Sequence, residues 1–113
     1  MDLDQLAHYR ALLEARREEL ASLSTGSKES RRPVELDQQS VGRLSRQDAL
    51  QQQAMANAQE LRRSGELRKI AGAMKRLDES EYGYCAECGD AIAAKRLEID
   101  LTALLCAICA RGR

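Results

Sequence analysis

Phenylalanine and tryptophan are absent from this chain of 113 residues, which has only three tyrosines and one proline. This composition excludes a thick aromatic core, although the length is that of one ordinary domain. No apolar run approaches the roughly 18 residues that a membrane-spanning helix needs. The first residues also lack the basic and then apolar pattern of a secretory signal. We therefore expect a cytoplasmic protein that does not cross a membrane.

An excess of charge of either sign is also missing, because eighteen basic residues balance eighteen acidic ones. This balance removes the strong positive field that marks many nucleic-acid-binding proteins. A Ser/His/Asp set, a glycine-rich phosphate loop and a carboxylate dyad are not found in the sequence. The single histidine, His8, has no second histidine or nearby cysteine with which to bind a metal. We therefore expect a binding protein and not an enzyme.

The only four cysteines form two CxxC pairs with seventeen residues between them: Cys85 and Cys88, then Cys106 and Cys109. This spacing is typical of a zinc ribbon or a related finger. Four thiolates complete a tetrahedral site and leave no position for water or substrate, so the metal would be structural. Two disulfides are the alternative, which an expected cytoplasmic location disfavours. We predict that these four cysteines bind one structural Zn²⁺.

The segment around the cysteines, residues 81–113, is predicted to be a small finger module. Gly83 and Gly89 flank the first pair and supply the positive φ angles that help a chain to wrap a metal. Four basic and four acidic side chains balance in residues 82–113, and four thiolates on one Zn²⁺ add a net negative charge: Lys95, Arg96, Arg111 and Arg113 against Glu87, Asp90, Glu98 and Asp100. Because DNA affinity is built mainly from neutralised phosphates, direct DNA binding by this module is disfavoured.

The first part of the chain has the pattern of an amphipathic helix over residues 3–23. Asp2 and Gln5 resemble a capping box at its start. Its apolar positions are Leu6, Leu13 and Leu20, which recur every seven residues, with Tyr9 and Leu23 beside them. So narrow an apolar stripe suits packing against another helix better than against a sheet.

A connection is expected next, because turn-forming residues and a helix breaker gather between Ser22 and Pro33. It could extend to about Ser40. Five basic residues and three acidic ones give residues 26–46 a mild positive excess: Lys28, Arg31, Arg32, Arg43 and Arg46 against Glu29, Glu35 and Asp37. Ordinary solvation explains such exposed charge as readily as a binding site does.

A second and longer helical pattern runs from Leu44 to Leu77 without a proline. Its apolar positions are Leu44, Ala49, Leu50, Ala54, Ala58, Leu61, Leu67, Ile70, Met74 and Leu77. The heptad register slips between Leu61 and Leu67, beside Gly65, where we expect the helix to bend. Ser45 and Asp48 resemble a capping box and mark one plausible start, with Leu44 and Val41 as alternatives.

Two apolar stripes joined by one polar connection are most simply buried against each other as an antiparallel hairpin. The predicted fold class is therefore mainly α: a coiled-coil hairpin over residues 1–80, with its tip connection around residues 24–44, and a C4 zinc finger over residues 81–113. The finger has few apolar residues, so bound zinc would supply much of its stability. We expect the protein to be a monomer.

Several segments resemble the DksA/TraR family of bacterial zinc-finger proteins. They are Tyr-Gly-Tyr-Cys-Ala-Glu-Cys-Gly at residues 82–89, Ile92, Lys95-Arg96-Leu97, the second cysteine pair, residues 41–49, and Gln-Gln-Gln-Ala-Met-Ala at residues 51–56. The resemblance covers most of residues 40–109. It implies a coiled-coil hairpin with a C4 finger. It also implies docking into the secondary channel of RNA polymerase, with the tip towards the active site, to alter the stability of the open complex.

The tip departs from the family pattern Asp-x-x-Asp-x-Ala, which does not occur in this sequence. Asp48 and Ala49 are the nearest match, with Ser45 in the place of the first acid. The resemblance implies that tip residues contact the partner, and our candidates are Arg43, Arg46, Asp48 and Ala49. The alternative function is a zinc-stabilised protein–protein adaptor that does not act on transcription.

Overall fold

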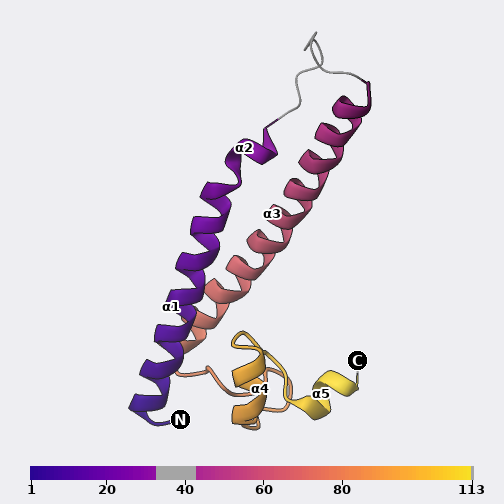
Figure 1. Ribbon diagram of the computed structural model, residues 1–113. Coiled ribbons are helices and arrows are strands. Elements are labelled where there is room, and N and C mark those ends of the chain that lie inside the picture. The colour runs from indigo at the N-terminus through magenta and orange to yellow at the C-terminus, as the bar shows by residue number, and fades with distance from the viewer. Residues whose placement is uncertain (33–42, 113) are drawn as a thin grey trace. The chain divides into compact units, whose positions relative to one another are not determined.

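The computed structural model describes residues 1–32 and 43–112, and these residues form five helices (Figure 1). Their bounds are α1 Leu3–Gly26, α2 Lys28–Arg31, α3 Arg43–Asp78, α4 Ala94–Ile99 and α5 Ala107–Arg111. Extended backbone pairs only at an isolated antiparallel bridge between Tyr84 and Ala91 in the part of the chain that is described. No described helix is long and apolar enough to span a membrane.

The chain divides into two compact units. The first unit contains Met1–Glu18 and Leu67–Arg113, and the second contains Glu19–Glu66. Each unit therefore contains part of α1 and part of α3.

The start of α1 follows the predicted capping box. The backbone N–H of Gln5 donates to Oδ1 of Asp2 at 2.8 Å, and the backbone N–H of Asp2 donates to Oε1 of Gln5 at 3.1 Å. Two of the N–H groups that a helix start leaves without a partner are thereby satisfied. The predicted stripe is confirmed at the buried residues Tyr9, Leu13 and Leu20, but it is wrong at Leu23, which is 49% exposed.

In the first unit, α1 pairs with the end of α3 in antiparallel orientation. Nη2 of Arg10 lies 2.8 Å from Oδ1 of Asp78, so the start of one helix lies against the end of the other. Leu13, Ile70 and Ala73 are among the most buried side chains of this unit. Apolar burial of this kind is the main favourable term in the packing of two helices.

The second unit has the same antiparallel arrangement. Nη2 of Arg63 donates to Oγ of Ser27 at 2.9 Å, and Nε2 of Gln53 donates to the carbonyl of Arg32 at 2.8 Å. Leu20 and Ala56 are its buried apolar residues. Polar contacts therefore contribute more to the packing of the two helices in this unit than we expected from the apolar pattern of the sequence.

Helical structure continues into the segment that was predicted to be a connection. α1 extends to Gly26 and α2 covers Lys28–Arg31, so the expected end of the first helix near Leu23 is wrong. The side chains explain the extension, because Nη2 of Arg31 donates to the carbonyl of Ser24 at 2.7 Å and so satisfies an acceptor at the end of α1. The rest of the predicted connection, including Pro33, Ser40 and Val41, lies outside the described residues.

α3 is one continuous helix from Arg43 to Asp78, so the helix is not interrupted beside Gly65, and the bend expected there stays a prediction. Its buried and half-buried residues include a set at alternating spacings of four and three, here called the seam positions: Ala49, Gln53, Ala56, Glu60, Arg63, Leu67, Ile70, Met74 and Leu77. The predicted slip arose because Leu61 was counted in the seam, whereas Leu61 is 74% exposed. Three of the five seam positions in the second unit are polar, namely Gln53, Glu60 and Arg63.

Four residues that were predicted to pack in the hairpin are exposed instead, and we call them the outer stripe: Leu50, Ala54, Ala58 and Leu61. Their exposure shows that α3 carries a second apolar face in the second unit. The side chain of Leu44, also predicted to pack, is outside the described set.

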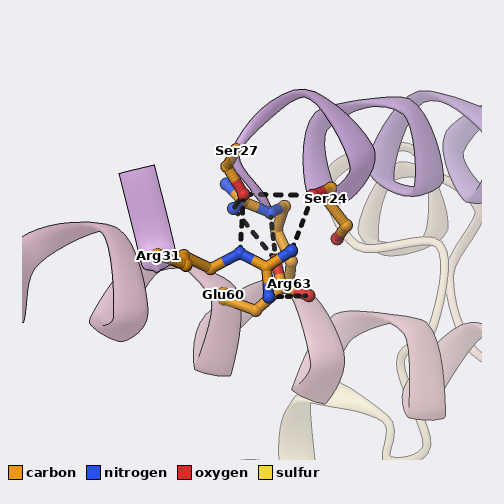
Figure 2. A network of polar contacts seen from close by, with 5 residues as sticks. All are labelled: Ser24, Ser27, Arg31, Glu60 and Arg63. Carbon is orange, nitrogen blue, oxygen red and sulfur yellow. Dashed lines mark hydrogen bonds and ion pairs between the residues drawn. The ribbon is translucent and has the colours of Figure 1, made fainter. Parts of the chain in front are cut away.

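A polar layer joins the helices of the second unit (Figure 2). Its members are Ser24, Ser27, Arg31, Glu60 and Arg63. The Ser27 hydroxyl accepts from Nε of Arg31 and from Nη2 of Arg63, each at 2.9 Å, and Oε2 of Glu60 lies 3.0 Å from Nη2 of Arg63. Desolvation opposes the charge of Glu60, but the nearby Ser24 hydroxyl and the two guanidinium groups lower the pKa of Glu60 below its ordinary value. Ser24, Ser27 and Arg31 were predicted to lie in a connection, and the layer was not predicted.

Candidate metal centre

The first cysteine pair lies in a tight loop closed by backbone hydrogen bonds. The N–H of Cys85 donates to the carbonyl of Asp90 at 2.8 Å, and the N–H of Ile92 donates to the carbonyl of Gly83 at 2.7 Å. Gly83 and Gly89 have φ angles of 87° and 77°, so the glycines are needed where they were predicted to be. The loop holds Cys85 and Cys88 on one short turn.

The second cysteine pair lies at the start of α5. Cys106 is the N-cap residue of this helix, and its Sγ accepts the backbone N–H of Cys109 at 3.5 Å. The N–H of Ala86 donates to the carbonyl of Leu104 at 2.8 Å, which ties the first loop to the segment before Cys106. The two cysteine pairs, which have seventeen residues between them in the sequence, are thus brought together.

A buried tyrosine anchors the finger to the helices of the first unit. Tyr82 is 1% exposed, its ring lies 5.6 Å from that of Tyr9, and its hydroxyl donates to the carbonyl of Leu101 at 2.7 Å. Burial raises the pKa of Tyr82 to about 12, since the neutral phenol is favoured away from water. This residue therefore packs on α1 with its ring and holds the finger backbone with its hydroxyl.

The four cysteine sulfurs converge to within 4.8 Å of one another. The sulfurs of Cys88 and Cys106 are 3.7 Å apart. Four sulfurs at about 2.3 Å from one zinc ion, at the corners of a tetrahedron, are separated by about 3.8 Å. All four cysteines are free thiols in this structure, in contrast to the disulfide alternative. The donor set and its spacing fit a tetrahedral zinc ion.

The thiols of the cluster differ in acidity. Hydrogen bonds from the backbone N–H groups of Cys88 and Cys106 lower the pKa of Cys85 to about 6. Contacts with the sulfurs of Cys106, Cys85 and Cys88 raise the pKa of Cys109 to about 12. Each further negative charge among sulfurs this close is harder to form. A divalent cation removes that difficulty, because it stabilises all four thiolates.

The candidate tip residues lie in the first two turns of α3, far along the chain from the cysteines. Arg46 and Asp48 are exposed, Ala49 is half-buried at a seam position, and the side chain of Arg43 is outside the described set. α3 begins at Arg43 and has no acidic residue in its first turn. Ser45 and Asp48 therefore lie inside the helix, and the prediction that they form its capping box is wrong.

Comparison with known proteins places this geometry in a family. Residues 80–113, which include all four cysteines, match the family described as the prokaryotic dksA/traR C4-type zinc finger. The RNA polymerase-binding transcription factor DksA of Escherichia coli K12 is 30% identical over 112 residues, which are 96% of this chain and 71% of that protein. The protein of the same name from Haemophilus influenzae is 44% identical over 43 residues, which span 38% of this chain and 30% of the relative.

A solved structure extends the similarity to the whole fold. The structure of transcription factor DksA2 from Pseudomonas aeruginosa superimposes with a TM-score of 0.83 at 28% identity, over 99% of this chain and 84% of that one. The chain belongs to the DksA/TraR family. Its predicted fold class, a helical hairpin with a C4 zinc finger, is confirmed. The clustered cysteines and the matching zinc-finger family also support one structural zinc ion per chain.

Proposed function

We propose that this protein is a transcription regulator that binds RNA polymerase through its secondary channel and modulates initiation. The observation that carries the proposal is its 30% identity, along 96% of its length, to a protein described as an RNA polymerase-binding transcription factor. The helical fold, which this chain shares with the solved structure of transcription factor DksA2, also supports the proposal. The protein acts as a cytoplasmic monomer in this proposal.

The finger has a structural role in the proposal. Cys85, Cys88, Cys106 and Cys109 are the four zinc ligands, since their sulfurs are the described donors that gather within metal-binding distance. With four protein ligands the metal has no open position, so it stabilises the finger and does no chemistry. We place the hairpin in residues 1–80 and the finger in residues 81–113.

The start of α3 supplies the part of the surface that alters the polymerase reaction. Arg46 and Asp48 expose one positive and one negative side chain there, while Ala49 lies half-buried beside them. Arg43 belongs to the same proposed group by its position in the first turn. Direct sequence-specific DNA binding is not part of the proposal, because the charges of the finger do not favour phosphate.

The experiment measures the affinity of the zinc-loaded protein for core RNA polymerase and the lifetime of the promoter open complex. We expect wild-type protein to bind and to change the lifetime. Asp48→Asn keeps the size of the side chain and removes its charge, so binding should be retained while the effect on lifetime is lost. Absence of wild-type binding would overturn the proposal. Binding with no effect on any initiation step would favour the adaptor alternative.

A further inference from the structure

The outer stripe of α3 is an exposed apolar face that belongs to the second unit. Leu50 and Leu61 at its ends are 42% and 74% exposed, and Ala54 and Ala58 between them are exposed as well. Successive residues of a helix are turned by about 100°, which places the outer stripe opposite the seam positions of α3. The face that packs in the hairpin is therefore a different one.

The charges along this face have one sign. Arg46 lies one turn before Leu50, Arg62 directly follows Leu61, and both are exposed. Between these arginines, the half of α3 centred on the outer stripe carries the side-chain amides of Gln47, Gln51 and Asn57. It carries no carboxylate, because Asp48 and Glu60 lie outside this half of the helix. The face has an apolar centre with a guanidinium at each end.

We infer that the outer stripe, with Arg46 and Arg62, is a docking face for an apolar protein surface that is bordered by carboxylates. The inference rests on the proposed function and deepens it, since that surface would belong to RNA polymerase. Leucine at each end and alanine in the middle would let a partner approach the α3 backbone closely between two anchors. Carboxylates on the partner would pair with the guanidiniums, which are well suited to such contacts.

The composition of the face favours this partner over two others. A nucleic acid gains affinity mainly from neutralised phosphates, and it would leave the apolar centre of this face uncovered. A second copy of the chain would bury two leucines and two alanines per partner, far less than the roughly 800 Å² per side of a standard stable interface. A larger partner that surrounds more of the helix can include the stripe as one part of its contact.

The test measures binding of fluorescently labelled, zinc-loaded full-length protein to core RNA polymerase. Leu50→Glu and Leu61→Glu should each weaken binding about tenfold or more, because each places a carboxylate against an acidic, apolar surface. Arg62→Glu should weaken binding more than Arg62→Ala, and the difference should shrink as salt is raised. Leu61→Met, which keeps the apolar contact, should bind like wild type.

Leu23→Glu is the matched control, because Leu23 is an exposed leucine of the same unit on α1. It should bind like wild type. Circular dichroism and zinc content are compared for all variants, and Leu50→Glu tests the stripe independently if Leu61→Glu loses helicity.

The outcomes separate this inference from the proposed function. If wild type binds polymerase and both glutamate variants on the stripe bind equally well, the docking face is wrong while the proposed function stands. If wild type does not bind polymerase, both are overturned. The docking face is also wrong if the stripe variants bind polymerase normally but lose binding to duplex DNA. The docking face is likewise wrong if sedimentation shows that wild type is a dimer and that Leu61→Glu is a monomer with unchanged polymerase binding.

Discussion

Cys106 is both the N-cap of α5 and a proposed zinc ligand. Replacing its sulfur atom by oxygen can separate the two roles. Serine is a preferred N-cap residue, so Cys106→Ser should keep the cap of α5 while removing a thiolate. We expect zinc content to fall from one ion per chain to well below one, as measured by plasma mass spectrometry on protein prepared without oxygen.

The same variant should lose order in the finger before it loses helicity. Structural zinc contributes on the order of 10–16 kcal/mol of apparent binding energy, whereas α1 and α3 pack through their own side chains. Amide hydrogen exchange should rise first in residues 83–109, with most of the far-ultraviolet helical signal retained. A wild-type protein without zinc, or a native disulfide between Cys85 and Cys88, would contradict the metal site.

Ionisation of Tyr82 should lower the stability of the folded protein at high pH. Its pKa is raised to about 12 in the folded protein, above the value of about 10 for an unfolded tyrosine. The folded state keeps a proton that the unfolded state has lost between these values, so stability falls as pH rises from 10 to 12. Below pH 10 the contribution is fully present.

Tyr82→Phe should remove this part of the pH dependence. At neutral pH the variant should be less stable by about 1 kcal/mol, because the hydrogen bond to the carbonyl of Leu101 is lost. Denaturant titrations at pH 8 to 11.5 should show the difference between the two proteins narrowing as pH rises. A constant difference would mean that the phenol titrates normally in the folded state.

At the scale of the element, apolar periodicity predicted α1 better than α3. The apolar stripe of α1 is buried at Tyr9, Leu13 and Leu20, where the period of the leucines matched the packing. In the part of α3 that belongs to the second unit, Gln53, Glu60 and Arg63 occupy seam positions, while Leu50 and Leu61 are exposed. A pattern of apolar residues cannot identify a seam that is built from hydrogen bonds and ion pairs.

The cysteine cluster was predictable for a different reason. Each CxxC pair specifies a local geometry for its two sulfurs. Only the approach of one pair to the other depends on the fold. The polar layer was not predictable in this way, because Ser27 and Arg63 are thirty-six residues apart and neither belongs to a motif.

Leu20→Ala should test the packing of α1. Leu20 is 1% exposed, so truncation should leave a cavity and lower the free energy of unfolding by about 2–5 kcal/mol. Leu61→Ala is the control, because the Leu61 side chain is 74% exposed and should contribute little. Equal effects of the two substitutions in denaturant titrations would contradict the assignment of the seam.

The polar layer should make the helix pair sensitive to acid. The pKa of Glu60 is lowered in the folded protein, so its contribution to stability is present above the ordinary pKa of about 4.3 and is lost as pH falls through the lower folded value. Wild type should therefore lose more stability than Glu60→Gln between about pH 5 and pH 3. Glu18→Gln, an exposed residue of α1, is the control and should follow wild type.

At the scale of the whole molecule, α1 and α3 each contribute residues to both compact units. The two helices of the hairpin therefore also belong to the unit that contains the finger. The four clustered sulfurs support a structural zinc ion in the finger, and the similarity to RNA polymerase-binding DksA supports the proposal that the helix pair binds a partner. Under the proposed function, metal binding and partner binding belong to different residues of one short chain.

The measurement that tests the proposed function most directly is competition for core RNA polymerase. Labelled, zinc-loaded protein is bound to the enzyme, and an unlabelled factor that occupies the secondary channel is added. We predict a single binding site and complete displacement at saturating competitor, with Leu23→Glu displaced like wild type. Simultaneous binding of both factors, or no binding of this protein to the enzyme, would contradict its proposed role as a secondary-channel regulator.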